Sequence, residues 1–371
     1  MHATSTRSHH RSPWSTALRL VIPLALLLGA ACGDDDDNGG TATPGDQTST
    51  TSAGQTSDEP LGTVRVGMSP TLNGLPVMVG IAEEIFLKHG VEVEATIIGD
   101  GGAIAAAVAG GDVDLGLISS QTSITNLEGG GTVQAVALTV SDATTVTQDQ
   151  NYGIVSGDPA VTELAQLEGK KMAVPDSVTL NTYARAALEQ SGVDPDSVEI
   201  LAVDGIPDTK PALSAGASAA VVTEPFITEL LRTVDGSSLL IRGGDIVANR
   251  IYVVGEQDYL AENAELVEPF VLALAEASQI IRQDPSTAAA ATTSFIPGLD
   301  LSIVEEALTN VNYDPRYSDF ISQAFDADTQ FLIDQGEIEA GVPFEDAFDP
   351  TFIEAIMADQ PELFDDLPAL S

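Results

Sequence analysis

Small hydroxyl and amide side chains follow several predicted strands of this chain. The runs TVRVGM, VDLGLI, KKMAVP and ASAAVV are typical of strands, and polar residues come directly or almost directly after each one. In chain order these residues are Ser69, Thr71, Asn73, Ser119, Ser120, Gln121, Ser177, Thr179, Thr223 and Glu224. Hydroxyl and amide groups both donate and accept hydrogen bonds, so the set predicts recognition of a small polar ligand. Taken singly, each residue is more simply explained as a helix cap or a turn residue, so the prediction depends on the group.

Covalent and metal chemistry have little raw material here. The chain has one cysteine, Cys32, and four histidines, of which His2, His9 and His10 lie in the first ten residues and only His89 lies in the body. Serine–histidine catalysis, a cysteine-based zinc or iron–sulfur site and a histidine-rich metal site are therefore disfavoured. We predict no catalytic residue, no metal and no cofactor. The formal net charge of −42 also disfavours nucleic acid as a partner.

The charged candidates for ligand contact are Arg250 and Glu224. An anion is often held by an arginine together with helix N-termini, and Arg250, just before the run IYVVG, is the best cationic candidate. Its alternative role is a structural salt bridge. Glu224 could accept a hydrogen bond from an amine or an aminopyrimidine, and its alternative role is a charge at a helix N-terminus.

The N-terminus has the pattern of an export signal. Basic residues precede a short apolar run at 20–31, which is below the roughly 20 residues that a membrane-spanning helix needs. Residues 1–31 are therefore predicted to be a signal peptide. Residues 33–60 contain no large apolar side chain and predict a disordered tether.

The residues before the single cysteine resemble a lipobox, the lipidation signal of bacterial lipoproteins. The motif reads Gly29-Ala30-Ala31-Cys32, with Gly29 where that family usually has leucine. The resemblance implies that Cys32 carries a lipid and that residues 32–60 tether the protein to the outer face of the cell membrane. The alternative is an ordinary signal peptide whose cleavage site happens to contain a cysteine.

Strand-like and helix-like segments alternate from residue 62 onwards, which predicts an α/β protein with mainly parallel sheets. The alternation restarts after residue 142, and a further strand, IYVVG, comes near residue 250. We therefore predict one lobe formed by 61–142 and 247–360 and a second formed by 143–246. Connecting segments near 141–150 and 244–250 would act as a hinge.

Three stretches together resemble the solute-binding proteins of ABC importers of the nitrate/sulfonate/taurine type, a group that includes pyrimidine-precursor-binding proteins of thiamine supply. They are KKMAVP preceded by LEG, GASAAVVTEPF, and IYVVGEQDYLAENAELVEPFVLALAEA, and the resemblance covers about residues 62–335. It implies a two-lobed periplasmic-binding-protein-like (type II) fold with two hinge crossings, a ligand held between the lobes, and docking of the closed monomer on a membrane permease. The family's frequent acidic residue before the AAVV strand is Ser218 here.

The expected function is delivery of a small polar solute to an ABC importer from outside the cytoplasm. The solute classes that the family suggests are sulfonates, taurine, nitrate-like anions and aminopyrimidine precursors of thiamine. One alternative is a surface sensor that binds a solute without importing it. Another is an enzyme like the iron-dependent pyrimidine synthases of this fold, but their cysteine-rich motif has no counterpart in the body of this chain.

Overall fold

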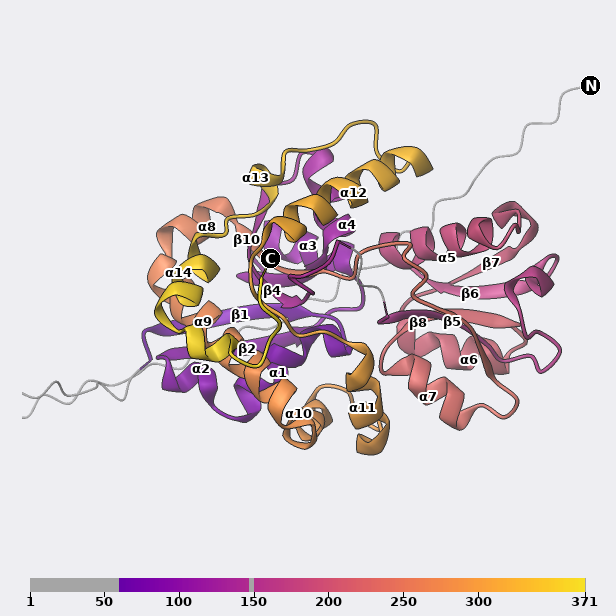
Figure 1. Ribbon diagram of the computed structural model, residues 1–371, viewed down its shortest axis with the longest axis horizontal. Helices are drawn as coiled ribbons and strands as arrows, with labels where there is room; N and C mark the ends of the chain where they lie inside the picture. Colours follow the sequence, from indigo (N-terminus) through magenta and orange to yellow (C-terminus); the bar gives the residue numbers. More distant parts are fainter. Residues whose placement is uncertain (1–59, 147–149, 371) are drawn as a thin grey trace, which may run out of the picture. The chain divides into compact units, whose positions relative to one another are not determined.

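The computed structural model describes residues 60–146 and 150–370 (Figure 1). The predicted signal peptide at 1–31, the predicted lipidation at Cys32 and all but the last residue of the predicted tether at 32–60 lie outside the described residues. None of the helices in the described part of the chain combines the length and the apolar character that crossing a membrane requires.

The strands of the described residues form two five-stranded sheets (Figure 1). The first sheet has the order β2-β1-β3-β10-β4, with bounds β1 (Gly62–Met68), β2 (Val91–Ile97), β3 (Leu115–Ser119), β4 (Val133–Val140) and β10 (Ile251–Glu256). The second sheet has the order β7-β6-β8-β5-β9, with bounds β5 (Tyr152–Ser156), β6 (Lys171–Pro175), β7 (Glu199–Val203), β8 (Ala219–Thr223) and β9 (Ser238–Arg242). The chain thus passes to the second sheet after β4 and returns after β9.

Helices cover both sheets (Figure 1). The early helices are α1 (Leu75–Ala82), α2 (Ile85–Lys88), α3 (Gly101–Ala109) and α4 (Ser120–Glu128), and those of the second sheet are α5 (Val178–Gln190), α6 (Thr209–Ser214) and α7 (Phe226–Thr233). The later helices are α8 (Gln257–Glu262), α9 (Ala264–Gln283), α10 (Pro285–Ala291), α11 (Leu301–Ala307), α12 (Asp319–Gln335), α13 (Phe344–Ala347) and α14 (Thr351–Asp359). Of these, α9 and α14 pack on β4, so the C-terminal part of the chain returns to the first sheet.

Short 3₁₀ helices lie in several of the connections. They are η1 (Leu72–Gly74), η2 (Leu164–Leu167), η3 (Pro195–Ser197), η4 (Ile206–Asp208), η5 (Thr292–Ser294), η6 (Leu308–Asn310) and η7 (Pro361–Phe364). Of these, η1 follows β1 and η4 follows β7, so both begin where a strand ends.

The fold is α/β as predicted, and each sheet is mixed, with four strands running in one direction and one strand reversed. In the first sheet β1 pairs in parallel with β2 and β3, whereas β10 runs antiparallel to β3 and β4. In the second sheet β5 runs antiparallel to β8 and β9. The antiparallel strands β5 and β10 directly follow the two connections between the sheets, which run from β4 to β5 and from β9 to β10. Each therefore begins at the side of its sheet where the other four strands end.

One predicted helix is interrupted. The apolar pattern of the run from Leu75 to Gly90 predicts a single helix, but the run divides into α1 and α2 at Glu83 and Glu84. Glu84 adopts the left-handed conformation with φ of 55°, which turns the chain between the two pieces. Phe86 can then fold back over Gly80, where a Cβ atom would lie only 2.3 Å from the ring.

Close packing sets the position of α3, whose N-terminus lies at the candidate site described below. The helix is rich in alanine and glycine, so it can approach the sheet closely. Gly116 of β3 faces it, and a Cβ at that position would lie 2.6 Å from Ile104 and 2.8 Å from Val108. A side chain at residue 116 would therefore push α3 away from the sheet.

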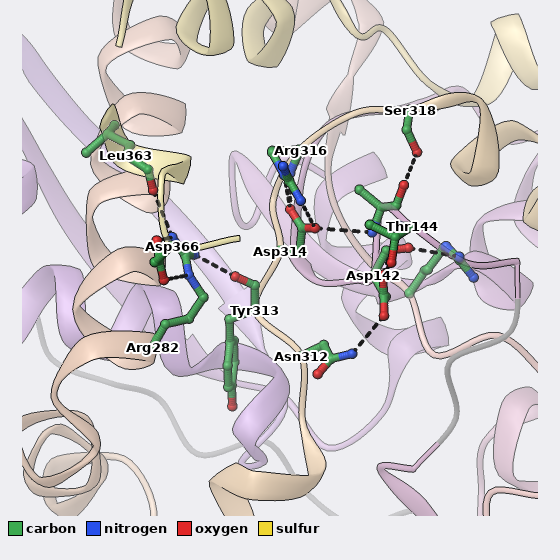
Figure 2. A network of polar contacts seen from close by, with 12 residues as sticks. Asp142, Thr144, Arg282, Asn312, Tyr313, Asp314, Arg316, Ser318, Leu363 and Asp366 are labelled. Carbon is green, nitrogen blue, oxygen red and sulfur yellow. Dashed lines mark hydrogen bonds and ion pairs between the residues drawn. The ribbon is translucent and has the colours of Figure 1, made fainter. Parts of the chain in front are cut away.

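The first crossing, which is the connection from β4 to β5, is held by a polar network with the segment 312–318 (Figure 2). Asn312 donates to the Asp142 carboxylate at 3.1 Å, and Ser318 donates to the Ala143 carbonyl at 2.6 Å. Asp314 accepts two hydrogen bonds from the Arg316 guanidinium group, at 2.9 and 2.8 Å, and one from the Ala143 amide at 3.4 Å. These contacts fix the start of the crossing against the C-terminal part of the chain.

Candidate functional site

A pocket of about 80 Å³ lies where the strand-end loops of the two sheets meet. Its lining comes from the ends of β3, β6 and β8, from the segments after β1, β2, β3, β6 and β7, and from the first residues of β5 and β10. Binding beyond the carboxyl ends of strands is the general arrangement in open α/β sheets. The lining residues are Ser69, Thr71, Asn73, Gly99, Asp100, Gly101, Leu117, Ile118, Ser119, Thr122, Tyr152, Pro175, Asp176, Ser177, Thr179, Leu180, Asp204, Gly205, Ile206, Thr223 and Ile251.

Most of the residues that the sequence singled out lie in this lining. They are Ser69, Thr71, Asn73, Ser119, Ser177, Thr179 and Thr223. Several of them also cap helices, so lining the pocket and capping a helix are compatible roles for one residue. Ser119 accepts a hydrogen bond from the Thr122 amide at 3.1 Å at the start of α4, and Ser177 accepts from the Leu180 amide at 3.4 Å at the start of α5. Capping holds each hydroxyl at the end of its strand.

Direct contacts join the two sides of the pocket. The Ser119 and Thr179 hydroxyls lie 2.7 Å apart, and the Thr179 hydroxyl also donates to the Gln121 side-chain carbonyl at 3.2 Å. Asn151, beside β5, donates to the side-chain carbonyl of Asn73 at 2.9 Å. The loops of the first sheet are therefore hydrogen-bonded to those of the second around the pocket.

The inner lining is neutral and buried. Thr71, Tyr152, Thr179 and Thr223 are each no more than 4% exposed. The hydroxyl oxygen of Thr223 is buried and has no hydrogen-bond partner among the described residues. A buried hydroxyl without a partner is unfavourable, and one that lines a pocket is available to a ligand.

The charged lining is acidic. Asp100, Asp176 and Asp204 contribute to the pocket, and the lining includes no lysine, arginine or histidine. Asp176 and Asp204 are exposed to solvent, whereas Asp100 is partly exposed and accepts a hydrogen bond from the Ala103 amide at 2.8 Å as the cap of α3. Across the described part of the chain, no group of three histidine, cysteine or carboxylate side chains is arranged to hold a metal ion.

Glu224 lies outside the lining. Its carboxylate is fully buried and pairs with Arg242 at 2.7 Å. It also accepts hydrogen bonds from the backbone amide and hydroxyl of Thr228, at 3.1 and 3.0 Å, and from Asn310 at 3.0 Å. These partners occupy the carboxylate within the protein, so the structure gives it a role in joining β8 and β9 to the segment after α11.

Arg250 also lies outside the lining, in the second crossing, which is the connection from β9 to β10. The residue is fully buried, and its guanidinium group donates to the backbone carbonyls of Val146 at 2.8 Å, Thr145 and Asp142. Burial lowers the pKa of Arg250 below its usual value. An arginine of the second crossing is thereby bound to carbonyls of the first.

Ser120 and Gln121 lie beneath the pocket, in the first turn of α4. Ser120 is buried, and its amide donates to the Arg250 carbonyl at 3.0 Å. The Gln121 side chain donates to the Ala248 carbonyl at 3.3 Å. Nearby, Asp328 of α12 accepts from the Ala248 amide at 3.4 Å, and burial raises the pKa of Asp328 to about 6. Both residues of α4 therefore contact the second crossing, and Gln121 also contacts the lining residue Thr179.

Asp100 and Asp204 were not predicted as site residues. Asp100 follows β2 and Asp204 follows β7. The signal that marks them in the sequence is a polar residue soon after a strand-like run, here VEVEATII and SVEILAV. Asp176 lies within the loop DSVT, which the sequence did single out for its hydroxyls. The acidic character of the lining is the principal feature that the sequence analysis missed.

The proteins that are similar in sequence to this chain include binding proteins from two bacterial genera. A protein of Brucella abortus (strain 2308) named "Putative binding protein" is 22% identical over 238 residues, which cover 63% of this chain and 71% of that protein. A protein of Brachyspira hyodysenteriae (strain ATCC 49526 / WA1) named "Putative ABC transporter periplasmic binding protein" is 24% identical over 285 residues, which cover 73% of this chain and 75% of that protein.

Solved structures share the fold at low sequence identity. The alkanesulfonate-binding protein SsuA from Xanthomonas axonopodis pv. citri, bound to MOPS, matches with a TM-score of 0.67 and 17% identity over 79% of this chain and 99% of that chain. The desulfurization enzyme DszB matches with a TM-score of 0.61 and 15% identity over 80% of this chain and 99% of that chain. The fold therefore occurs both in a binding protein and in an enzyme.

A family model described as "NMT1/THI5 like" matches residues 72–288, which is more than half of the chain. The matched segment contains β3, β6, β8 and β10, and with them most of the loops that line the pocket. This chain belongs to the NMT1/THI5-like family.

Proposed function

We propose that this protein is an extracytoplasmic solute-binding protein that delivers a small polar solute to an ABC importer. The observation that carries the proposal is the pocket between the two sheets, whose lining hydroxyls come from strand ends on both sides. Family membership and the names of the two relatives are in keeping with it. A volume of about 80 Å³ suits a solute of few atoms, since one water needs roughly 10–15 Å³ of such space.

Hinged closure is the proposed mechanism. The lobes are 61–142 with 247–360, and 143–246, and the two crossings between them form the hinge. A solute that contacts both lobes favours the closed arrangement by its differential affinity for it. The Ser119–Thr179 contact belongs to this closed arrangement, because it joins loops of opposite lobes. A permease could then recognise the closed monomer.

An enzymatic role is the second candidate, because DszB shares the fold. The lining has serine and threonine hydroxyls and three aspartates but no histidine, lysine or cysteine. Among the described residues, no serine or threonine hydroxyl of the lining donates to one of these carboxylates, so none is paired with a base that could activate it. This lining supports binding without catalysis. Recovery of unaltered solute after prolonged incubation with the purified protein would support a binding role, and its conversion would contradict it.

The proposed location is the outer face of the cell membrane, with a lipid on Cys32 as the anchor. Replacing Cys32 by alanine should release the protein into the medium, and cell fractionation measures this directly. Continued membrane attachment of the Cys32→Ala protein would contradict the lipid anchor. It would leave the solute-binding role unaffected.

Calorimetry and thermal-shift measurements with a solute panel test the central proposal. The panel contains sulfonates, taurine, nitrate and aminopyrimidines, together with the charge-matched probes described below. We expect at least one member to bind and to raise the unfolding temperature, because a ligand that binds only the folded state stabilises it. Absence of binding across the panel, with a folded protein, would contradict the proposal.

A further inference from the structure

The charge of the pocket restricts which solute it can accept. The lining carries a negative formal charge from Asp100, Asp176 and Asp204, and it has no basic side chain to offset this charge. An anion entering this pocket would lose solvation and gain no ion pair. A cation would gain charge-assisted hydrogen bonds to carboxylate oxygens.

Two arginines, Arg242 and Arg250, are already engaged by groups of the protein. Arg242, on β9 beside β5, pairs with the buried carboxylate of Glu224 and donates to the Gln150 carbonyl at 3.0 Å. Arg250 precedes the lining residue Ile251, but its guanidinium group donates to carbonyls of the first crossing. Turning either arginine toward a ligand would leave buried partners uncompensated.

Helix N-termini would be the other source of anion binding, and those at the pocket are already capped by side chains. The caps Asp100, Ser119 and Ser177 accept amide hydrogen bonds from the first turns of α3, α4 and α5. The Ser120 amide is bound to the Arg250 carbonyl. At α3 the capping group is itself a carboxylate, which offsets the favourable dipole there.

The inner end of the pocket carries an independent sign of ligand contact. Thr223 is 2% exposed, lines the pocket, and its hydroxyl has no hydrogen-bond partner within the described residues. Tyr152 lies beside it in the lining and is equally buried. The pocket therefore combines a neutral inner end that can hydrogen-bond a polar group with a carboxylate-bearing outer side.

We infer that the solute is a small organic cation, bearing an ammonium or amidinium group, rather than nitrate or a sulfonate. Its charged nitrogen group faces Asp176 and Asp204 on the exposed side, and its body lies against Tyr152 and Thr223. This inference rests on the proposed solute-binding function and narrows its ligand. The net charge of −42 acts in the same direction, because it raises the local concentration of cations.

Three isosteric probes test the charge preference: butanamidinium, butanamide and butanoate. Their affinities are measured by calorimetry at low salt, with propanesulfonate and nitrate as further anions. We expect butanamidinium to bind at least fivefold more tightly than butanamide, and the anions to bind more weakly than either. Tighter binding of an anion, or equal binding of the amide and the amidinium, would overturn the inference and leave the proposed function standing. If no probe and no other panel member bound, the proposed function would fall.

Two double variants distinguish the contribution of the pocket carboxylates to cation binding from that of the acidic surface as a whole. Asp176→Asn with Asp204→Asn should weaken butanamidinium binding about fivefold and leave butanamide binding unchanged, a size typical of exposed charge pairs. The matched control is Asp258→Asn with Glu262→Gln, which removes the same charge from exposed positions of α8, outside the lining. An equal loss in the control would mean that the attraction is not specific to the pocket, and would overturn the inference.

Discussion

Replacing Thr223 by valine should make the protein more stable and, at the same time, a poorer binder. The side chain is 2% exposed, and its hydroxyl has no partner in the described structure. Leaving a hydroxyl buried and unpaired costs about 1–3 kcal/mol, and valine has nearly the same shape with a methyl group in its place. We therefore expect the free energy of unfolding to rise by about 1 kcal/mol.

Solute affinity should change in the opposite direction. If the Thr223 hydroxyl bonds the solute, its loss removes one neutral hydrogen bond, worth about 0.5–1.5 kcal/mol. That corresponds to binding weaker by roughly 2- to 12-fold. Urea unfolding of the free protein and calorimetry with the tightest member of the solute panel measure the two effects separately.

Thr139→Val provides the matched control. Thr139 lies on β4, is fully buried, and its hydroxyl likewise has no partner in the described structure, but it does not line the pocket. Its replacement should stabilise the protein to a similar extent without altering affinity. A loss of stability in Thr223→Val, with a gain in Thr139→Val, would mean that the Thr223 hydroxyl has a partner within the protein. The reasoning would then be refuted.

Three further predictions concern the groups around the pocket. Burial raises the pKa of Asp328 from 3.8 to about 6, so the native state binds this proton more tightly than the unfolded state. The free energy of unfolding should therefore fall as pH rises from 4 to 6, by at most about 3 kcal/mol. Asp328→Asn should flatten this decline in urea unfolding, and an unchanged pH dependence would contradict the prediction. Arg242→Met leaves the Glu224 carboxylate buried without its ion-pair partner and should cost about 3 kcal/mol in urea unfolding, most of which Glu224→Gln should restore in the double variant. Thr179→Val removes both contacts of that hydroxyl with the opposite loop. It should weaken solute binding several-fold and increase the radius of gyration measured by solution scattering. An unchanged radius and affinity would argue against a role of Thr179 in closure.

The strand ends could be predicted from the sequence because their signals are local. Alternating apolar residues followed by Ser119, Ser177 or Thr223 identify the end of a strand, and most pocket hydroxyls were found in this way. The interruption at Glu84 was missed because the apolar pattern continues through it. The short strand β9 was also missed, because its residues SLLIR do not alternate clearly between apolar and polar.

The roles of Glu224 and Arg250 could not be predicted in the same way. Arg250 was a candidate as a cation for an anionic ligand, and Glu224 as an acceptor for an amine or an aminopyrimidine. Their partners lie elsewhere in the chain: Asn310 bonds Glu224 across 86 positions, and the Val146 carbonyl lies 104 positions from Arg250. Only the tertiary structure brings these groups together, so no local pattern in the sequence marks them as buried.

The bond between Arg250 and the first crossing limits how this molecule can move. The guanidinium group binds carbonyls of Asp142, Thr145 and Val146, so one side chain of the second crossing spans five residues of the first. A twist or slide of one crossing alone would break at least one of these bonds in a buried setting. We therefore expect the two connections to behave as a single joint, about which the proposed lobes would swing rather than slide past each other. A solute would then meet the same pairs of facing groups each time the pocket forms.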